Sequence, residues 1–126
     1  MKLTLFPTLE ETLELHRLVL ERFGGQPGAR DLGMLQSALG RPQTGYYDTL
    51  WQQAAALLQS LAMNHPFIDG NKRVAFALTA IFLRMNKHRL VVTAADGEAF
   101  LLQKVIADRA DLTEIAGWLE SHTRPV

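Results

Sequence analysis

Residues 50–85 read LWQQAAALLQSLAMNHPFIDGNKRVAFALTAIFLRM, a pattern that predicts two helices joined by a short polar loop. The first helix, from Leu50 to Asn64, is rich in Ala and Leu, which are strong helix formers. It is expected to stop at His65, because Pro66 disfavours the α conformation of the residue that precedes it. The loop that follows therefore separates this helix from a second one.

The second helix is predicted to begin near Gly70 or Asn71 and to run to about Asn86. Ten of the twelve residues from Val74 to Met85 are apolar. The helix is therefore apolar nearly all round, and we expect it to lie at the centre of the fold as its most buried stretch. It is too short, and too often interrupted by polar residues, to span a membrane.

Further helices are predicted before and after this pair. Thr8 and Glu11 form a capping-box pattern at the start of the first of them, and Asp111 with Glu114 forms a similar pattern before the last. The four additional helices are predicted from Leu9 to Phe23, from Asp31 as cap to Leu39, from about Asp96 to Ala107, and from Leu112 to Ser121.

The remaining segments are predicted to be connections. Residues 41–49 contain Pro, Gly and two adjacent tyrosines without a clear period, which predicts an exposed loop, and residues 90–92 are expected to form an extended connection. No alternation of apolar and polar residues is long enough to predict a sheet. The sequence therefore predicts an all-α fold: one compact domain, residues 1–126, with six or seven helices packed around a buried central helix.

The composition excludes several classes of protein. Thirteen Lys and Arg balance thirteen Asp and Glu in 126 residues, and a net charge of zero argues against nucleic acid as a partner. The sequence has no cysteine, which excludes disulfides, thiolate zinc sites and a cysteine nucleophile. Residues 1–7 lack the apolar run of a secretory signal, and no segment is predicted to enter a membrane, so a cytoplasmic location is expected.

Residues with the potential for chemistry gather in the loop between the two central helices, His65-Pro66-Phe67-Ile68-Asp69-Gly70-Asn71-Lys72-Arg73. The start of a helix presents unpaired backbone N–H groups and the positive end of the dipole, and Gly70 lets an anion approach that backbone closely. Lys72 and Arg73 are unfavourable for the helix dipole there, which suggests that an anion completes the site. Together with Asn71 they predict a phosphate-binding site that suits a triphosphate such as ATP.

Three other residues of this loop are assigned roles. Asp69 can hold a Mg²⁺ ion that bridges the phosphates of the nucleotide. Imidazole is the side chain best suited to accept a proton near neutral pH, so His65 is the candidate general base. Phe67 is predicted to be an apolar anchor that pins the loop to the core.

Each charged residue of the loop also has a purely structural interpretation. His65 could stabilise the C-terminal end of a helix, and Asp69 could cap the helix that follows, instead of binding metal or in addition to it. Lys72 and Arg73 could form surface ion pairs of little consequence. The presence of all of them within nine residues favours the functional interpretation.

Residues outside the loop carry weaker signals. Histidines there show no metal-ligand spacing and are expected to be structural or exposed: His16, His88 and His122. Trp51 and Trp118 lie at helical positions and are expected in the core. For Tyr46 and Tyr47 two interpretations stay open, contact with a protein target or local packing.

The nine residues from His65 to Arg73 resemble the motif of the Fic/Doc family, and specifically that of its death-on-curing (Doc) toxin branch. The chain length, the helical order and the position of the motif after the middle of the sequence agree with this resemblance. A nine-residue pattern with fixed offsets is far more specific than a lone glycine fingerprint. The resemblance implies the Fic/Doc helical bundle, with ATP and Mg²⁺ as cofactors.

Two departures from the general Fic pattern bear on the reaction. Fic adenylyltransferases usually have Gly at the position of Lys72 and a second Arg at the position of Phe76. The resemblance to Doc implies that the Lys form binds the nucleotide in the opposite orientation, so that the γ-phosphate, and not AMP, is transferred to a hydroxyl of a translation elongation factor. The protein would then be a kinase-type Ser/Thr phosphotransferase that arrests protein synthesis, although the sequence has no motif of ordinary kinases.

The resemblance also bears on regulation. Fic proteins that restrain themselves carry an inhibitory [ST]xxxE[GN] segment, and no Ser or Thr of this sequence has Glu four residues later. Restraint is therefore expected from an antitoxin protein supplied in trans. Three functions remain open: a Doc-type kinase toxin, which Lys72 favours; a Fic-type adenylyltransferase; and a non-catalytic antitoxin-binding module, which the intact set of site residues disfavours.

Overall fold

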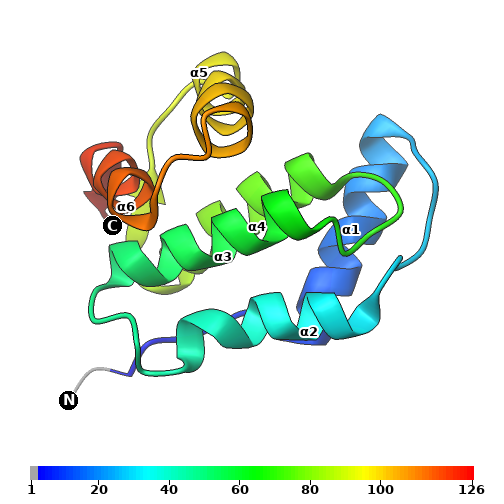
Figure 1. The fold of residues 1–126 in the computed structure, drawn as a ribbon, viewed down its shortest axis with the longest axis horizontal. Helices are drawn as coiled ribbons and strands as arrows, with labels where there is room; N and C mark the ends of the chain where they lie inside the picture. Colours follow the sequence, from blue (N-terminus) through cyan, green and yellow to red (C-terminus); the bar gives the residue numbers. More distant parts are fainter. Residues whose placement is uncertain (1–2) are drawn as a thin grey trace.

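Six α-helices make up most of residues 3–126, the part of the chain that the computed structural model describes (Figure 1). This confirms the predicted all-α bundle of six or seven helices. Within these residues no helix is long and apolar enough to cross a membrane. The helices are α1 (Leu9–Phe23), α2 (Leu32–Gly40), α3 (Leu50–Asn64), α4 (Asn71–Met85), α5 (Ala94–Ala99) and α6 (Leu112–Ser121).

The helix starts follow the capping signals of the sequence. The Thr8 hydroxyl accepts a bond from Glu11 N (3.1 Å), and the Glu11 carboxylate accepts one from Thr8 N (2.8 Å). Asp31 and Asp111 each accept a bond from the backbone N–H three residues further on. These bonds satisfy N–H groups that have no partner within the helix, which is why polar residues with short side chains begin these helices.

The most buried helix is α3, and not α4. Every residue from Ala54 to Ala62 except Gln59 is buried, and α3 contacts α2, α4, α6 and the segment before α6. In α4 the buried residues form one face, and Ile81 on the other side is 41% exposed. The prediction that residues 74–85 are the most buried stretch is therefore wrong. Three consecutive alanines, Ala54 to Ala56, let neighbouring helices approach α3 from several sides, whereas part of the apolar surface of α4 is left uncovered.

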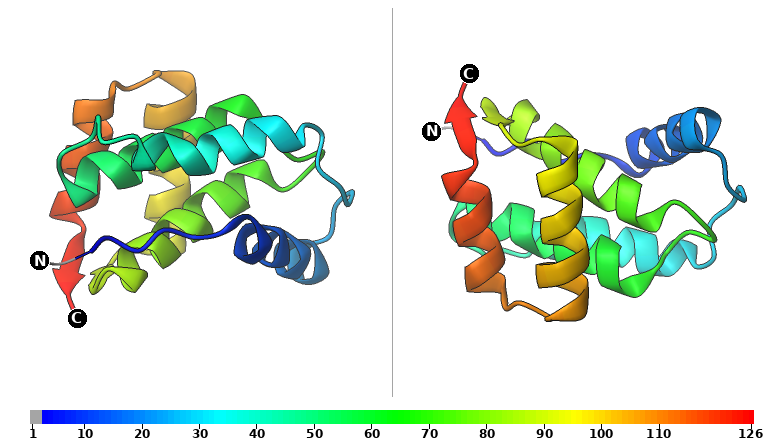
Figure 2. Two further views of the ribbon diagram at one scale, coloured as in Figure 1. Left: turned by 90° about the horizontal axis from the view of Figure 1, so that it is seen from below. Right: turned by 90° about the horizontal axis from the view of Figure 1, so that it is seen from above.

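The region before the last helix is one continuous helical segment. It begins at Thr93, whose hydroxyl accepts a bond from Asp96 N. It then runs through α5 and continues as a π-helix from Phe100 to Ala107. The helix begins two residues before the predicted start near Asp96, because Thr93 is its cap. Phe100 stacks on Trp118 of α6 with ring centroids 3.9 Å apart. Figure 2 shows these two helical segments side by side across α3 and α4.

Two strands of three residues each tie the C-terminal segment to the end of α4. They are β1 (His88–Leu90) and β2 (Thr123–Pro125), which pair antiparallel with His88 opposite Pro125. The sequence did not predict this small sheet, because three residues are too few to show a period of two.

The connection from residue 41 to residue 49 is partly ordered by packing. It opens with a 3₁₀ turn (Arg41–Gln43), and Arg41 Nε donates a 2.7 Å bond to the Tyr47 hydroxyl. Tyr47 therefore packs locally, whereas Tyr46 is 81% exposed. The expected exposed loop is correct for most of the segment, but Pro42 within it is buried. The two tryptophans expected in the core, Trp51 and Trp118, are half-buried and pack against it.

Candidate active site

The loop between α3 and α4 is closed by the side chain of Asn71. Its Oδ1 accepts a bond from Phe67 N and its Nδ2 donates one to Phe67 O, both at 2.9 Å. The amide for which a phosphate contact is predicted thus holds the loop backbone, and its Nδ2 keeps a second N–H. Asn71 also contributes the first backbone N–H of α4, which precedes the hydrogen-bond ladder of the helix.

Phe67 fastens the loop to the rest of the molecule. Its side chain is 1% exposed, and its ring stacks on the imidazole of His16 from α1, with centroids 3.8 Å apart and planes 10° apart. His16 is itself buried. The stacked rings hold the loop rigidly against α1, and they thereby fix the backbone of the polar residues on either side of Phe67.

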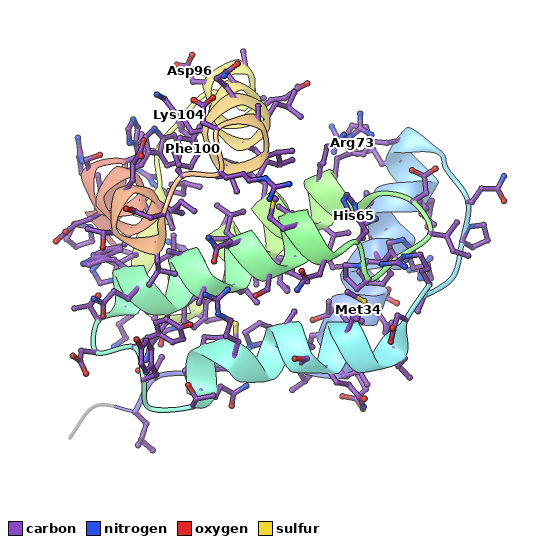
Figure 3. All side chains as sticks on the ribbon, in the orientation of Figure 1. Met34, His65, Arg73, Asp96, Phe100 and Lys104 are labelled. Carbon is purple, nitrogen blue, oxygen red and sulfur yellow. The ribbon has the colours of Figure 1, made fainter. Side chains whose placement is uncertain are left out.

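His65 ends α3 in the left-handed conformation, with φ 50° and ψ 59°. Arg30 binds the last carbonyls of this helix: Nε donates to His65 O and a terminal N–H donates to Asn64 O, both at 2.8 Å. The cation that stabilises the C-terminal end of α3 is therefore Arg30, and not the imidazole of His65. His65 is exposed, and Figure 3 shows it where α3 passes into the loop that joins the two central helices.

Asp69 is held by three hydrogen bonds. Its carboxylate accepts from Gly70 N on Oδ1 (2.9 Å) and from Gln26 N on Oδ2 (3.2 Å), and its carbonyl oxygen accepts from His16 Nε2 (2.8 Å). The N-cap of α4 is Gly70, with φ 81° and no side-chain cap bond. Asp69 is therefore not the helix cap that the structural interpretation allowed.

The donor set of the loop fits a Mg²⁺ ion that is shared with phosphates. Each oxygen of the Asp69 carboxylate accepts one bond from a backbone N–H, which leaves each a further lone pair for a cation. Within residues 3–126 no group of three or more His, Asp or Glu side chains could hold a metal ion without other ligands. One carboxylate together with phosphate oxygens is a common way for proteins to bind Mg²⁺.

The start of α4 offers donors for an anion. The helix ladder begins with the bond from Val74 N to Gly70 O (3.0 Å), so the N–H groups of residues 71–73 precede it. Lys72 and Arg73 are exposed, and within residues 3–126 neither forms an ion pair. The guanidinium of Arg73 lies 4.3 Å from the ring centroid of Phe23 at the end of α1, a cation–π contact that holds it near the loop.

The segment before α2 runs along the loop and pairs with it. Ala29 and Phe67 form a single antiparallel bridge, and Ile68 N donates to Gly28 O (3.1 Å). Arg30 N and Asp31 N both donate to the carbonyl oxygen of the proline that follows His65, at 2.8 and 3.0 Å. The loop is thus supported along its whole length by residues that precede it in the sequence by more than thirty positions.

A groove of about 490 Å³ opens beside this support, between α1 and residues 25–29, and His16 and Phe67 form part of its lining. On its α1 side Arg17 pairs with Glu14 (2.6 Å) and Glu21 (2.8 Å). The hydrogen bond from Arg17 lowers the pKa of the Glu14 carboxyl below its ordinary value. All three side chains are exposed, so these ion pairs contribute little to stability.

The structure thus keeps the predicted residues together and adds three that the sequence analysis missed. His65, Asp69 and the start of α4 share one loop, as their spacing required. The additions are His16, Gln26 and Arg30, which bond the loop backbone or Asp69 from α1 and from the segment after it. No local signal marks them: His16 is expected to be structural or exposed, and residues 26–30 read Gln-Pro-Gly-Ala-Arg, which matches no motif.

Comparison with known proteins agrees with the loop and the fold. A family model described as Fic/DOC family matches residues 6–83, which include the whole segment from His65 to Arg73. The protein named Toxin Doc from Mycolicibacterium smegmatis (strain ATCC 700084 / mc(2)155) is 43% identical over 103 residues, which cover 77% of this chain and 79% of that protein. The protein named Protein kinase doc from Escherichia phage P1 is 37% identical over 81 residues, 61% of this chain and 64% of that protein. The chain therefore belongs to the Fic/DOC family.

Proposed function

We propose that this protein is a Doc-like toxin that transfers the γ-phosphate of ATP to a hydroxyl group of a translation elongation factor and thereby arrests protein synthesis. The observation that carries the proposal is the loop itself, in which an exposed imidazole follows α3 and the free N–H groups of α4 begin six residues later. The relatives named Toxin Doc and Protein kinase doc support toxicity and phosphate transfer, respectively.

The phosphates of ATP are proposed to bind at the start of α4. The backbone N–H groups of residues 71–73 precede the helix ladder, and Gly70 begins the helix without a side-chain cap that would occupy them. Lys72 and Arg73 neutralise phosphate charge, which is the main contribution a protein makes to phosphate transfer. A Mg²⁺ ion held by Asp69 and phosphate oxygens supplies further charge neutralisation when it is bound.

His65 is proposed to accept the proton of the target hydroxyl. As that proton leaves, the hydroxyl oxygen forms a bond to the γ-phosphorus, the bond from phosphorus to the bridging oxygen breaks, and ADP leaves with both bonding electrons. General base catalysis of this kind typically contributes about 10²–10⁴-fold. Holding ATP and the target hydroxyl in line supplies much of the remaining rate acceleration. This alignment requires a rigid loop.

The packing of Phe76 also favours phosphate transfer over AMP transfer. Phe76 lies one helical turn beyond Arg73, and a Cβ atom added to Gly97 of α5 would come within 2.5 Å of its ring. The ring is therefore packed tightly against the backbone of α5. In this chain an aromatic ring fills the position at which Fic adenylyltransferases carry a second cation, so the anion site relies on Lys72 and Arg73.

An antitoxin is proposed to bind a second groove, which lies between α1 and α4 and has a volume of about 450 Å³. Its floor is apolar and includes Leu18 and Ile81, which are 47% and 41% exposed. Its α1 rim carries three glutamates, Glu10, Glu11 and Glu14, of which Glu11 also caps α1 and Glu14 pairs with Arg17. This combination suits an amphipathic segment with apolar residues on one face and Lys or Arg beside them.

The proposal is tested by incubating the protein with a cell lysate and ATP labelled on either the α- or the γ-phosphate. Label from the γ-position should appear on one protein of the size of an elongation factor, and a His65→Asn variant should transfer it far more slowly. Label from the α-position would instead identify the protein as an adenylyltransferase. Absence of transfer from either position, with folded protein and bound ATP, would favour a non-catalytic module.

A further inference from the structure

We propose that His16 of α1 and the turn that follows α1, residues 25–26, position the Asp69 carboxylate for Mg²⁺, and so set the affinity of the site for the metal. The inference rests on the proposed role of Asp69 as a metal ligand. It concerns residues that contact Asp69 from 43 and 53 positions away in the sequence and that neither touch nucleotide nor transfer a proton in the proposed reaction.

His16 fixes the backbone of Asp69. A carbonyl oxygen only accepts hydrogen bonds, so the 2.8 Å contact with Asp69 O requires the proton to lie on His16 Nε2. The imidazole is 5% exposed and lies flat against the Phe67 ring, so it has little freedom to turn away. The peptide that joins Asp69 to Gly70 is therefore held from α1, immediately before the start of α4.

The turn after α1 fixes the Asp69 carboxylate. Gln26 N donates to Oδ2, while Gly70 N donates to Oδ1, so one backbone N–H holds each oxygen. Gly25 makes this approach possible: a Cβ atom there would lie 2.8 Å from Asp69 Oδ2 and 2.9 Å from Leu20 Cδ2. With a φ of 127°, the residue also has a conformation that other amino acids rarely adopt.

Two donors on the two oxygens determine the plane of the carboxylate and therefore the direction of its remaining lone pairs. A ligand that is oriented before the metal arrives binds it more tightly, and loss of such an outer contact typically costs about 10–100-fold in metal affinity. The turn is thus a positioning element for Asp69, although it belongs to a different part of the chain.

The chain offers a matched pair of variants for the test. Gly24 and Gly25 both have positive φ, at 81° and 127°, so alanine strains the backbone at either position. A Cβ atom at Gly24 meets nothing within 4 Å, whereas at Gly25 it meets the Asp69 carboxylate. Calorimetry measures ATP binding with Mg²⁺ and with EDTA, and the ratio of the two affinities reports the contribution of the metal without any turnover.

We expect Gly25→Ala to reduce this ratio by about 10-fold or more, close to the value of Asp69→Asn, and Gly24→Ala to leave it near that of the unaltered protein. His16→Phe, which keeps the stack on Phe67 and removes the donor, should reduce the ratio in the same direction. If circular dichroism shows that Gly25→Ala does not fold, the result for His16→Phe tests the inference instead.

The outcomes separate this inference from the proposed function. An unchanged ratio in Gly25→Ala, or in His16→Phe where the first variant is unfolded, together with a reduced ratio in Asp69→Asn, overturns the inference and leaves the metal role of Asp69 intact. An unchanged ratio in Asp69→Asn removes that metal role, and the inference fails with it.

Discussion

The guanidinium of Arg30 binds the carbonyl oxygen of His65 at 2.8 Å, across 35 positions of sequence. A second N–H of the same group binds Asn64 O, so one side chain satisfies two carbonyls at the end of α3. This arrangement stabilises the helix end and holds the backbone of the proposed general base in its left-handed conformation. The position of the imidazole therefore depends on a residue from the loop before α2.

Replacing Arg30 by Ala should lower both stability and phosphate transfer. Hydrogen bonds from a charged donor typically contribute about 1.5–3 kcal/mol, and we expect a loss of about 1 kcal/mol because Arg30 is exposed. Urea unfolding measures the first effect and transfer of γ-label the second. Arg30→Lys should lose less stability because it keeps the charge. Full activity and unchanged stability in Arg30→Ala would contradict the role given to this residue.

Replacing His65 by Asn should abolish growth arrest without unfolding the protein. Asn tolerates the left-handed conformation at this position better than most residues, so the backbone need not move. The rate of label transfer should fall by about 10²–10⁴-fold, the usual contribution of a general base. Circular dichroism and thermal melting serve as the fold control. A variant that remains toxic would exclude His65 as the base.

Replacing Arg73 by Ala should weaken ATP binding by about 10-fold or more, because a charged donor to phosphate is lost. Phe23→Leu should have a smaller effect, because it removes only the cation–π contact that holds the guanidinium, worth about 0.5–1 kcal/mol at an exposed site. Calorimetry with ATP measures both. Equal affinities in all three proteins would remove Arg73 from the anion site.

Replacing Lys72 by Gly should reduce transfer of the γ-label, because the exposed ammonium group is proposed to anchor the phosphates in the orientation for phosphate transfer. The same variant shows whether removal of the Lys72 side chain lets ATP bind in the opposite orientation. In that case α-label would appear on the target. Lys72→Arg keeps the charge and is the matched control. Unaltered γ-transfer by Lys72→Gly would show that the direction of transfer does not depend on this residue.

Replacing Ile81 by Asp should prevent the antitoxin from relieving growth arrest. The substitution places a negative charge on the apolar floor of the groove between α1 and α4, at a residue of α4 that lies outside the loop. Leu102→Asp, at a similarly exposed apolar residue outside this groove, is the control and should stay responsive to the antitoxin. Co-expression and growth curves measure relief. Equal relief of both variants would place the antitoxin elsewhere.

The helices and the loop were predictable because their signals are local. Thr8 and Glu11 cap α1 as their spacing indicates. Helix α3 ends before His65, because Pro66 disfavours the α conformation of the residue that precedes it. The proposed site lies within nine consecutive residues, so its members are neighbours in any fold that keeps this loop. By itself the sequence therefore determined the all-α class, most helix boundaries and the family.

Only the tertiary structure decided what surrounds and supports that loop. Burial depends on how many neighbours a helix has, so composition alone did not show that the Ala-rich α3, and not the more apolar α4, lies at the centre. The two bonds of the Asn71 amide to the backbone of Phe67 also became visible only in the structure. The contacts of His16, Gln26 and Arg30 join residues 34 to 53 positions apart. Such pairs leave no periodic or local pattern, because their proximity is created by the packing of α1 and α2 against the central helices.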